Sequence, residues 1–320
     1  MNILVTGSNG FIGSHLIKRL SDDSEFIINA LVRSNSSTSK TDGINYIVGD
    51  LLQLHSWEKN LKNIDIVVHV AGLAHVMDNF ADSREQFRNQ NTSATIDFAK
   101  ICLSYSVKRF IYISSIKVLG EYTEIGVPFS HKSNENPIDP YAISKYEAEL
   151  GLRLISKENK MEIVIIRPPL VYGPSVKGNF QRLIKLISTE LPLPLSGIKN
   201  KRSMISIYNL VDLIMVCLNH PNASNKIFLV SDDNDLSTSD LLRFLSLSGG
   251  YRSRLFKVPS EFLRFSLMLL GKKNIYERLF KSMQVDISYT KNQLSWQPPY
   301  DLMDSLLKSW LPGTRKKHKE

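Results

Sequence analysis

Cysteine is scarce in this chain of 320 residues, and long apolar runs are missing from it. The two cysteines, Cys102 and Cys217, are spaced neither as a disulfide framework nor as a zinc site, so we expect no metal and a reducing, cytoplasmic location. The apolar character of residues 1–20 is interrupted by Asn9, the glycines and His15, and no charged segment comes before it, so we expect no secretion signal. The late apolar stretch Phe262–Leu270 is too short for a membrane span and contains Arg264, so it is predicted to be a packed helix.

The formal net charge of +9 favours an anionic partner such as a nucleotide diphosphate, a nucleic acid or an anionic membrane. Basic and aromatic residues do not interleave, so a nucleic-acid partner is not expected. The basic tail, residues 313–320, is predicted to be solvated, and peripheral contact with a membrane is the less favoured alternative.

Short apolar runs alternate with amphipathic segments through the first half of the chain. Such runs are typical of strands that are buried on both faces of a parallel sheet. The fold class is therefore predicted to be α/β, a doubly wound parallel sheet of the Rossmann type. The predicted strands are Ile3–Val5, Ile27–Val32, Tyr46–Val48, Ile66–Val70, Phe110–Ile113, Ile163–Ile166 and Ile227–Val230.

Helical patterns separate these strands, and prolines loosen the pattern after Arg167. The main predicted helices are Phe11–Leu20, Ser83–Ser104, Tyr141–Ser156 and one that begins near Asn209. We predict a dinucleotide-binding domain over residues 1–170 and a mainly substrate-binding portion over 171–312. A strand within residues 205–232 should return to the first domain, so the smaller C-terminal domain is interleaved with it.

A glycine-rich loop follows the first predicted strand and opens the first predicted helix. Its sequence is Gly7-Ser8-Asn9-Gly10-Phe11-Ile12-Gly13. Glycines let the backbone approach a pyrophosphate, and the N–H groups and positive dipole end of the helix favour that anion. We predict a dinucleotide phosphate site here; the alternative is a tight turn before an ordinary helix.

Tyr141 and Lys145 are four residues apart on a predicted helix, so both side chains lie on one face. A lysine ammonium beside a phenol is expected to lower the pKa of the phenol and to make it a usable general base or acid. Ser114 and Ser115 end a predicted strand at the edge where open α/β sheets bind ligands. A solvated helix face and a simple strand-ending turn are the alternatives, but the three signals together favour a catalytic site.

These motifs resemble those of the extended short-chain dehydrogenases/reductases, in particular the nucleotide-sugar epimerase/dehydratase family that includes UDP-glucose 4-epimerases. The residues that carry the resemblance are Thr6–Gly13, Gly49–Leu51, His69–Gly72, Asn91, Ser114–Gly120, Tyr141–Lys145 and Arg167–Pro174. The segment from Pro168 to Phe180 is most similar to the polysaccharide-linked branch.

The resemblance implies roles for individual residues. Ser115, Tyr141 and Lys145 would be catalytic. The implied cofactor-binding residues are Gly7, Asn9, Gly10, Phe11, Ile12, Gly13, Asp50, Leu51, Val70, Ala71, Gly72, Asn91, Tyr141 and Lys145. The implied substrate-binding residues are Ser115, Asn179, Arg202 and Arg278.

Arg33 departs from the common pattern, because it stands where an acidic residue would bind a ribose hydroxyl. A cation there would accommodate a 2′-phosphate. The residue therefore favours NADP or a relaxed choice of cofactor, whereas the resemblance implies NAD for a 4-epimerase.

The function predicted from these residues and the resemblance is a UDP-glucose or UDP-N-acetylglucosamine 4-epimerase that oxidises carbon 4 transiently. A first alternative is an NADPH-dependent reductase of a UDP-4-keto-6-deoxy-hexosamine in surface-polysaccharide synthesis, and a second is a non-catalytic NADP-binding sensor. A dehydratase is disfavoured because Lys117, and no acidic pair, follows Ser115. The resemblance also implies a homodimer built on the helices at 83–104 and 141–156.

Overall fold

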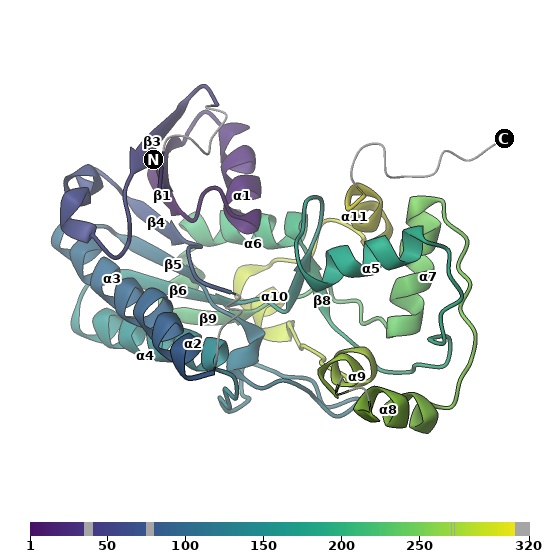
Figure 1. Cartoon of the computed structure of the whole chain (residues 1–320). Coiled ribbons are helices and arrows are strands. Elements are labelled where there is room, and N and C mark those ends of the chain that lie inside the picture. Colours follow the sequence, from purple (N-terminus) through teal and green to yellow (C-terminus); the bar gives the residue numbers. More distant parts are fainter. Residues whose placement is uncertain (35–40, 75–79, 270, 272, 311–320) are drawn as a thin grey trace.

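The computed structural model (Figure 1) describes residues 1–34, 41–74, 80–269, 271 and 273–310, apart from the side chains of residues 80–82, 267, 273 and 274. The predicted basic tail, residues 313–320, lies outside the described residues.

Seven parallel strands form one sheet in the order β3-β2-β1-β4-β5-β6-β9. They are β1 (Asn2–Thr6), β2 (Ile27–Val32), β3 (Ile44–Val48), β4 (Ile66–His69), β5 (Arg109–Ile113), β6 (Glu162–Arg167) and β9 (Lys226–Leu229). All seven predicted strands are confirmed. The reversal of strand order beside β1 opens a crevice at the carboxyl ends of the strands, which is where such sheets bind ligands.

Helices cover both faces of the sheet, as the doubly wound prediction requires. The helices α1 (Phe11–Ser21) and α6 (Ile207–Asn219) pack on one face, and α3 (Ala94–Ser104) and α4 (Pro140–Glu158) pack on the other (Figure 1). Successive side chains of a strand point to opposite faces of the sheet, so Ile3 packs in the cluster with α1, whereas Leu4 packs in the cluster with α3.

The helix predicted over residues 83–104 is instead three consecutive pieces. They are α2 (Phe80–Phe87), a π-helical turn η4 (Arg88–Ser93) and α3. Asn91 lies in the π turn, and its buried amide is hydrogen bonded outside the helix. Wide turns of this kind often occur at functional sites.

The rest of the chain forms a smaller lobe beside the sheet (Figure 1). The strands β7 (Leu170–Tyr172) and β8 (Met204–Ser206) pair in parallel. Around them are α5 (Asn179–Ser188), α7 (Thr238–Gly249) and α11 (Leu302–Lys308), with a core of their own. Because β9 comes after β7 and β8 and pairs with β6, the chain returns to the main sheet. The division at residue 170 stays a prediction.

Three further helices follow α7: α8 (Ser260–Leu269), α9 (Lys273–Phe280) and α10 (Ser288–Leu294). The helix predicted over Phe262–Leu270 exists, but the prediction that it is packed is wrong for its outer side. Phe262 and Phe265 are 64% and 63% exposed. The short 3-10 helices are η2 (Leu54–Ser56), η3 (Glu58–Leu61), η5 (Ile116–Val118) and η6 (Pro221–Ala223).

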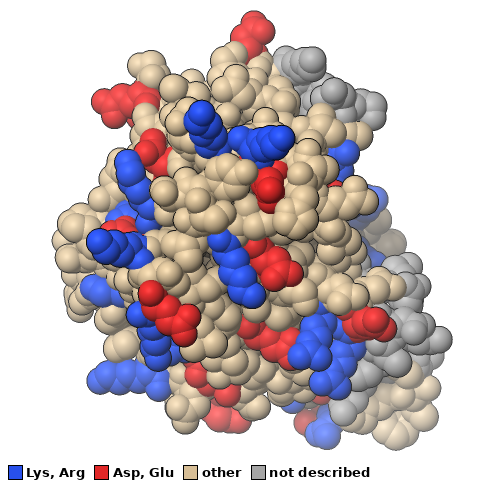
Figure 2. All heavy atoms as spheres, turned by 90° about the vertical axis from the view of Figure 1, so that its left-hand side faces the viewer, with Lys and Arg blue, Asp and Glu red and all other residues tan. Residues whose placement is uncertain are grey.

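Charge on the surface is mixed where Figure 2 shows it. On that face Lys and Arg side chains are interspersed with Asp and Glu. The net positive charge therefore forms no continuous basic surface there of the kind that tracks a nucleic acid. Among the described residues, no helix has the length and apolarity needed to cross a bilayer.

Candidate active site

The glycine loop between β1 and α1 is shaped by close backbone contacts. Gly7 has a φ of +66°, and a Cβ on it would lie 2.7 Å from the Ala71 nitrogen. A Cβ on Gly13 would lie 2.2 Å from the Gly7 carbonyl oxygen. No side chain caps the N-terminus of α1. A narrow backbone cradle beneath uncapped helical N–H groups fits the pyrophosphate of a dinucleotide.

The segment 70–72 connects this cradle to Lys145. A Cβ on Gly72 would lie 3.1 Å from the Lys145 Nζ and 3.2 Å from the Asn91 Oδ1. Asn91 accepts a hydrogen bond from the Leu73 N–H (2.7 Å) and donates to the Leu73 carbonyl oxygen (3.0 Å). Its amide also donates to Ser144 (3.1 Å). Asn91 therefore holds the segment 70–73 against α4.

A buried histidine supports the same segment from below. His69 is hydrogen bonded to Thr6 (2.8 Å) and to Thr95 (2.9 Å), and the Thr6 hydroxyl accepts from the Ala71 N–H (3.2 Å). Burial lowers the pKa of His69 to about 3, and the nearby Lys145 charge acts in the same direction. His69 is thus a neutral structural link between β1, β4 and α3.

The residues predicted to surround the adenosine lie at the carboxyl ends of β2 and β3. Gly49 donates to the Val32 carbonyl oxygen (2.9 Å), which holds the two strand ends together. Arg33 is exposed directly after β2, and the Asp50 carboxylate accepts from the Leu52 N–H (3.0 Å). A guanidinium exposed at this edge is suited to pair with a phosphate if one is bound there.

The predicted catalytic residues meet at the same edge of the sheet, beyond β5. Ser115 caps the short helix η5 by accepting a hydrogen bond from the Lys117 N–H (3.3 Å). Its hydroxyl is near enough to Tyr141, in the first turn of α4, to act on the pKa of that phenol. One turn further on, the Lys145 ammonium donates to the Ile113 carbonyl oxygen (3.0 Å) and lies 4.7 Å from the centre of the Tyr112 ring. The sequence thus brings a hydroxyl, a phenol and an amine together as expected.

Burial dominates the protonation of this group. It raises the pKa of Tyr141 to about 12, against the opposing effect of the Ser115 hydrogen bond, and the Asp139 charge raises it further. Burial also lowers the pKa of Lys145 to about 8, although Glu149 opposes the shift. The expectation that the lysine lowers the pKa of the phenol is therefore wrong for this structure, because burial raises that pKa and the other contributions come from Ser115 and Asp139, not from Lys145.

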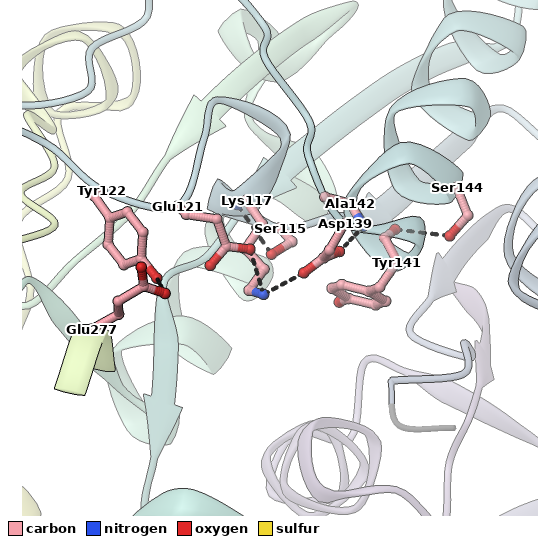
Figure 3. A network of polar contacts seen from close by, with 9 residues as sticks. All are labelled: Ser115, Lys117, Glu121, Tyr122, Asp139, Tyr141, Ala142, Ser144 and Glu277. Atoms are coloured by element: carbon pink, nitrogen blue, oxygen red, sulfur yellow. Dashed lines mark hydrogen bonds and ion pairs between the residues drawn. The ribbon is translucent and has the colours of Figure 1, made fainter. Parts of the chain in front are cut away.

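Lys117 organises a polar network beside Tyr141 (Figure 3). Its ammonium binds the carboxylates of Glu121 (2.9 Å) and Asp139 (2.5 Å). The other oxygen of Asp139 caps α4 by accepting from the Ala142 N–H (2.6 Å). Burial lowers the pKa of Lys117, but its contacts with Asp139 and Glu121 outweigh this effect and raise the pKa above its usual value. Acidic groups thus lie near Ser115 after all, and both are paired with Lys117.

Ser114 has a structural partner. Its hydroxyl donates to the fully buried Glu149 carboxylate, which also accepts two hydrogen bonds from the Arg167 guanidinium through Nε (3.0 Å) and Nη2 (2.5 Å). Arg167 also binds Glu135 (3.0 Å). This buried cluster ties β5, α4 and β6 together, so of the two strand-end serines only Ser115 faces Tyr141.

Three of the four residues predicted to bind substrate come together from distant parts of the chain, and the fourth, Ser115, lies beyond β5. Asn179 begins α5, and its Oδ1 accepts from the Arg278 guanidinium on α9 (3.4 Å). Arg202 donates to the Arg278 carbonyl oxygen (3.2 Å). Burial lowers the pKa of Arg202. Two guanidinium groups beside a helix N-terminus are suited to a diphosphate.

Several residues of this region were not identified from sequence. Tyr122 donates to Glu277 (3.0 Å; Figure 3), which joins the loop after η5 to α9. Asp139 could have been found, because an Asp before a proline at the start of a helix is a common N-cap pattern. The pairing of Lys117 with Asp139 could not, because 22 residues separate them.

Comparison with known proteins identifies the family. The sequence profile of the "NAD dependent epimerase/dehydratase family" matches residues 3–231. The chain belongs to this family, which confirms the resemblance inferred from its motifs.

Individual relatives extend the comparison over the whole chain. The chain is 45% identical over 305 residues to a UDP-glucose 4-epimerase of Vibrio cholerae, covering 95% of this chain and 92% of the relative. It superposes on the UDP-glucuronic acid 4-epimerase of Bacillus cereus in complex with NAD with a TM-score of 0.77 at 23% identity, covering 97% and 95% of the two chains. The UDP-glucose 4-epimerase of Thermotoga maritima with UDP-glucose gives a TM-score of 0.77 at 19% identity and 97% coverage of both chains. These structural matches confirm the predicted fold class.

Proposed function

We propose that this protein is an NAD-dependent 4-epimerase of a UDP-hexose, either UDP-glucose or UDP-N-acetylglucosamine. The observation that carries the proposal is the group Ser115, Tyr141 and Lys145 beside the glycine cradle, at one edge of the sheet. The 45% identity to a UDP-glucose 4-epimerase supports the reaction and the substrate class.

In this mechanism Tyr141 takes the proton of the hydroxyl at carbon 4, and Ser115 holds that oxygen by a hydrogen bond. The chemistry that a nicotinamide dinucleotide supplies is reversible acceptance of a hydride from carbon 4. The 4-keto sugar would rotate within the site, and Tyr141 would then return the proton to the same oxygen, which would give the 4-epimer without net oxidation. With a pKa of about 12, Tyr141 is protonated at neutral pH, so the phenolate is a strong base that is scarcely populated, and the rate of this step should rise with pH.

We assign Gly7, Gly10 and Gly13 to the pyrophosphate, Asp50 and Leu51 to the adenosine, and Lys145 to the nicotinamide ribose. The geometry that supports this assignment is the continuous path from the glycine loop to Lys145. Asn179, Arg202 and Arg278 would bind the diphosphate of the substrate, as their mutual contacts and their charge suggest.

A reductase that consumes NADPH remains the second candidate. The exposed Arg33 directly after β2 favours it, because a guanidinium there can pair with a 2′-phosphate. Such an enzyme would reduce a UDP-4-keto-6-deoxy-hexosamine and use Tyr141 as the acid.

The deciding experiment identifies the nucleotide that the purified protein releases on denaturation and then measures interconversion of UDP-N-acetylglucosamine and UDP-glucose with their 4-epimers, without added cofactor. Stoichiometric NAD with interconversion supports the epimerase. Uptake of NADPH without interconversion supports the reductase, and binding of NADP without turnover of any of these sugars or of a 4-keto sugar supports a sensor.

We also propose a homodimer and a reducing, cytoplasmic location. The exposed Leu150 and Leu154 on α4 offer an apolar contact for a second copy. Cys102 and Cys217 are both free and buried, which fits a compartment that does not form disulfides.

A further inference from the structure

Lys117 lies two residues after Ser115, and its backbone and side chain contact different parts of the site. Its N–H donates to the Ser115 hydroxyl (3.3 Å). Its ammonium donates to the carboxylates of Asp139 (2.5 Å) and Glu121 (2.9 Å), as Figure 3 shows. One residue therefore contacts both the segment that follows β5 and the start of α4.

Asp139 connects this ammonium to Tyr141. One carboxylate oxygen of Asp139 binds Lys117, and the other caps α4 by accepting from the Ala142 N–H (2.6 Å). The backbone carbonyl oxygen of Asp139 also accepts from the Ile143 N–H (2.9 Å). Tyr141 lies in the turn that these bonds fix, so the position of Asp139 determines where the phenol lies.

The ion pairs of Lys117 are partly withdrawn from solvent. The side chains of Lys117, Asp139 and Glu121 are 38%, 32% and 25% exposed. Pairs on a fully exposed surface contribute little because water and salt screen them, whereas partly buried, charge-assisted hydrogen bonds are stronger. The Lys117 ammonium can therefore hold α4 and the segment after β5 at a fixed spacing.

The segment after β5 is anchored to the sheet without this ammonium. The Ser114 N–H donates to the Ile166 carbonyl oxygen (2.8 Å), and the Ile116 N–H donates to the Pro168 carbonyl oxygen (2.9 Å). These backbone bonds fix the segment against β6 and the residues that follow it. What Lys117 adds is a side-chain link to the helix that carries Tyr141.

We propose that Lys117 is a positioning residue for proton transfer: its ammonium ties the segment that carries Ser115 to the cap of the helix that carries Tyr141. The link fixes the serine hydroxyl and the phenol relative to each other. Lys117 acts here through Ser115 and Asp139. The proposal rests on the proposed proton transfer by Tyr141 and adds the residue that keeps the two hydroxyl groups aligned.

The phenol of Tyr141 reports on this link. Burial raises its pKa most, the Ser115 side chain lowers it, and the Asp139 charge raises it. Without the ammonium, the Asp139 carboxylate is no longer held on Lys117, and Ser115 is no longer tied to α4. Both changes act in one direction, towards a higher pKa of Tyr141.

The other groups around the phenol stay in place when Lys117 is replaced. Phe87 on α2 lies with its ring 5.9 Å from the Tyr141 ring, and Lys145 lies one turn further along α4. Burial raises the pKa of Tyr112 on β5, and the charges of Glu149 and Tyr141 add to this effect. A change in the titration of Tyr141 therefore follows from Ser115 and Asp139.

The test compares Lys117→Met with the wild type in the turnover of UDP-glucose, across the pH range in which both stay folded. We expect kcat to fall at least about tenfold, since small misplacements of reacting groups are costly. KM should be unchanged, because the diphosphate residues Asn179, Arg202 and Arg278 are left as they are. The rise of kcat with pH should move to higher pH.

Two further variants separate positioning from a general loss of stability. Lys117→Arg keeps a cation that can reach both carboxylates and should recover most of kcat. The matched control Glu121→Gln leaves the contact of Lys117 with Asp139 intact and should behave as the wild type does. If Lys117→Met does not fold, Lys117→Gln carries the same expectations, because it also lacks the charge.

A signal that needs no turnover completes the test. In protein labelled with ¹³Cζ-tyrosine, the Tyr141 resonance, identified by its loss in Tyr141→Phe, should shift in Lys117→Met and stay in place in Glu121→Gln. If the wild type turns over no UDP-hexose, the proposed function fails and this signal alone decides about Lys117. An unshifted resonance, a kcat equal to that of the wild type, a lowered kcat with an unmoved pH profile, or an equal loss in Glu121→Gln would overturn the proposal.

Discussion

Tyr141 and Lys145 lie on one helix face, and burial favours the neutral form of each. The pKa of the phenol rises to about 12 and that of the ammonium falls to about 8. The protein thus spends folding free energy to keep a lysine in a dry position. Such a cost is typical of a residue retained for function and not for stability.

Replacing this lysine should therefore stabilise the fold. At pH 7 the buried Lys145 ammonium, with a pKa about 8 against 10.5 in the unfolded chain, costs up to about 3 kcal/mol, and Lys145→Met removes that cost. Thermal unfolding should show a higher melting temperature for the variant. Its advantage should shrink between about pH 8 and pH 10.5, where only the unfolded wild type still binds the proton. The exposed Lys157→Met on the same helix should change nothing, and a less stable Lys145→Met would contradict the account.

Asp139 sets the charge beside the phenol. Its carboxylate raises the pKa of Tyr141, and Asp139→Asn removes that charge while keeping an N-cap for α4. The rise of kcat with pH should consequently move to lower pH in this variant. The matched control is Glu121→Gln, which contacts the same Lys117 but leaves Asp139 ionised and should not move the profile. A profile of Asp139→Asn that stays in place or moves upward would show that Tyr141 is not the titrating base.

At the scale of elements, the cradle between β1 and α1 depends on the close approach of its glycines. A methyl group on Gly13 would meet the Gly7 carbonyl oxygen at 2.2 Å, so Gly13→Ala must push the loop outward. We expect the affinity for the dinucleotide to fall by at least about tenfold, since misplaced N–H groups lose charge-assisted hydrogen bonds. Isothermal titration with NAD and with NADPH measures this effect.

Gly43→Ala is the control for that loop. Gly43 also lies in a turn, with a φ of +82°, but no atom lies within 4 Å of the added methyl group. The Gly43→Ala variant should be slightly less stable because of backbone strain, and its affinity for the dinucleotide should equal that of the wild type. Equal nucleotide affinity in Gly13→Ala and the wild type would mean that the cofactor does not bind at this loop.

The elements show what the sequence could and could not predict. The central strands β1, β4, β5 and β6 were predictable because they are buried on both faces and so read as short apolar runs. The edge strand β3 is only partly buried and was found from the shorter run Tyr46–Val48. The π turn around Asn91 was missed, since one wide turn leaves helical periodicity nearly intact. The packing of α8 was mispredicted because Phe262 and Phe265 look like core residues, and an apolar pattern does not tell an inner face from an outer one.

The parts of the site that could be predicted from the sequence are those that lie in local motifs. Tyr141 and Lys145 are close in sequence, and Ser115 follows a recognisable strand, so their meeting at one edge follows from the parallel topology. The contact of Asn179 with Arg278 and the pairing of Lys117 with Asp139 depend on side chains far apart in the chain. No periodicity encodes such contacts.

For the whole molecule, the proposed dimer makes a direct prediction. One chain has a mass of 36.4 kDa, and light scattering should give twice this value for the wild type. Leu150→Glu/Leu154→Glu should reduce the mass to that of one chain, because charges at an apolar contact between copies are costly. A wild type of single mass would contradict the dimer, and an unaffected double variant would move the contact away from α4.

The central claim is that Tyr141 performs proton transfer at carbon 4 of a UDP-hexose. The most direct test is the turnover of UDP-glucose and UDP-N-acetylglucosamine by Tyr141→Phe, measured together with its content of bound nucleotide. We predict a turnover at least about 10²-fold below that of the wild type with the nucleotide still bound, since only the acid–base group is removed. Turnover equal to that of the wild type would contradict the account.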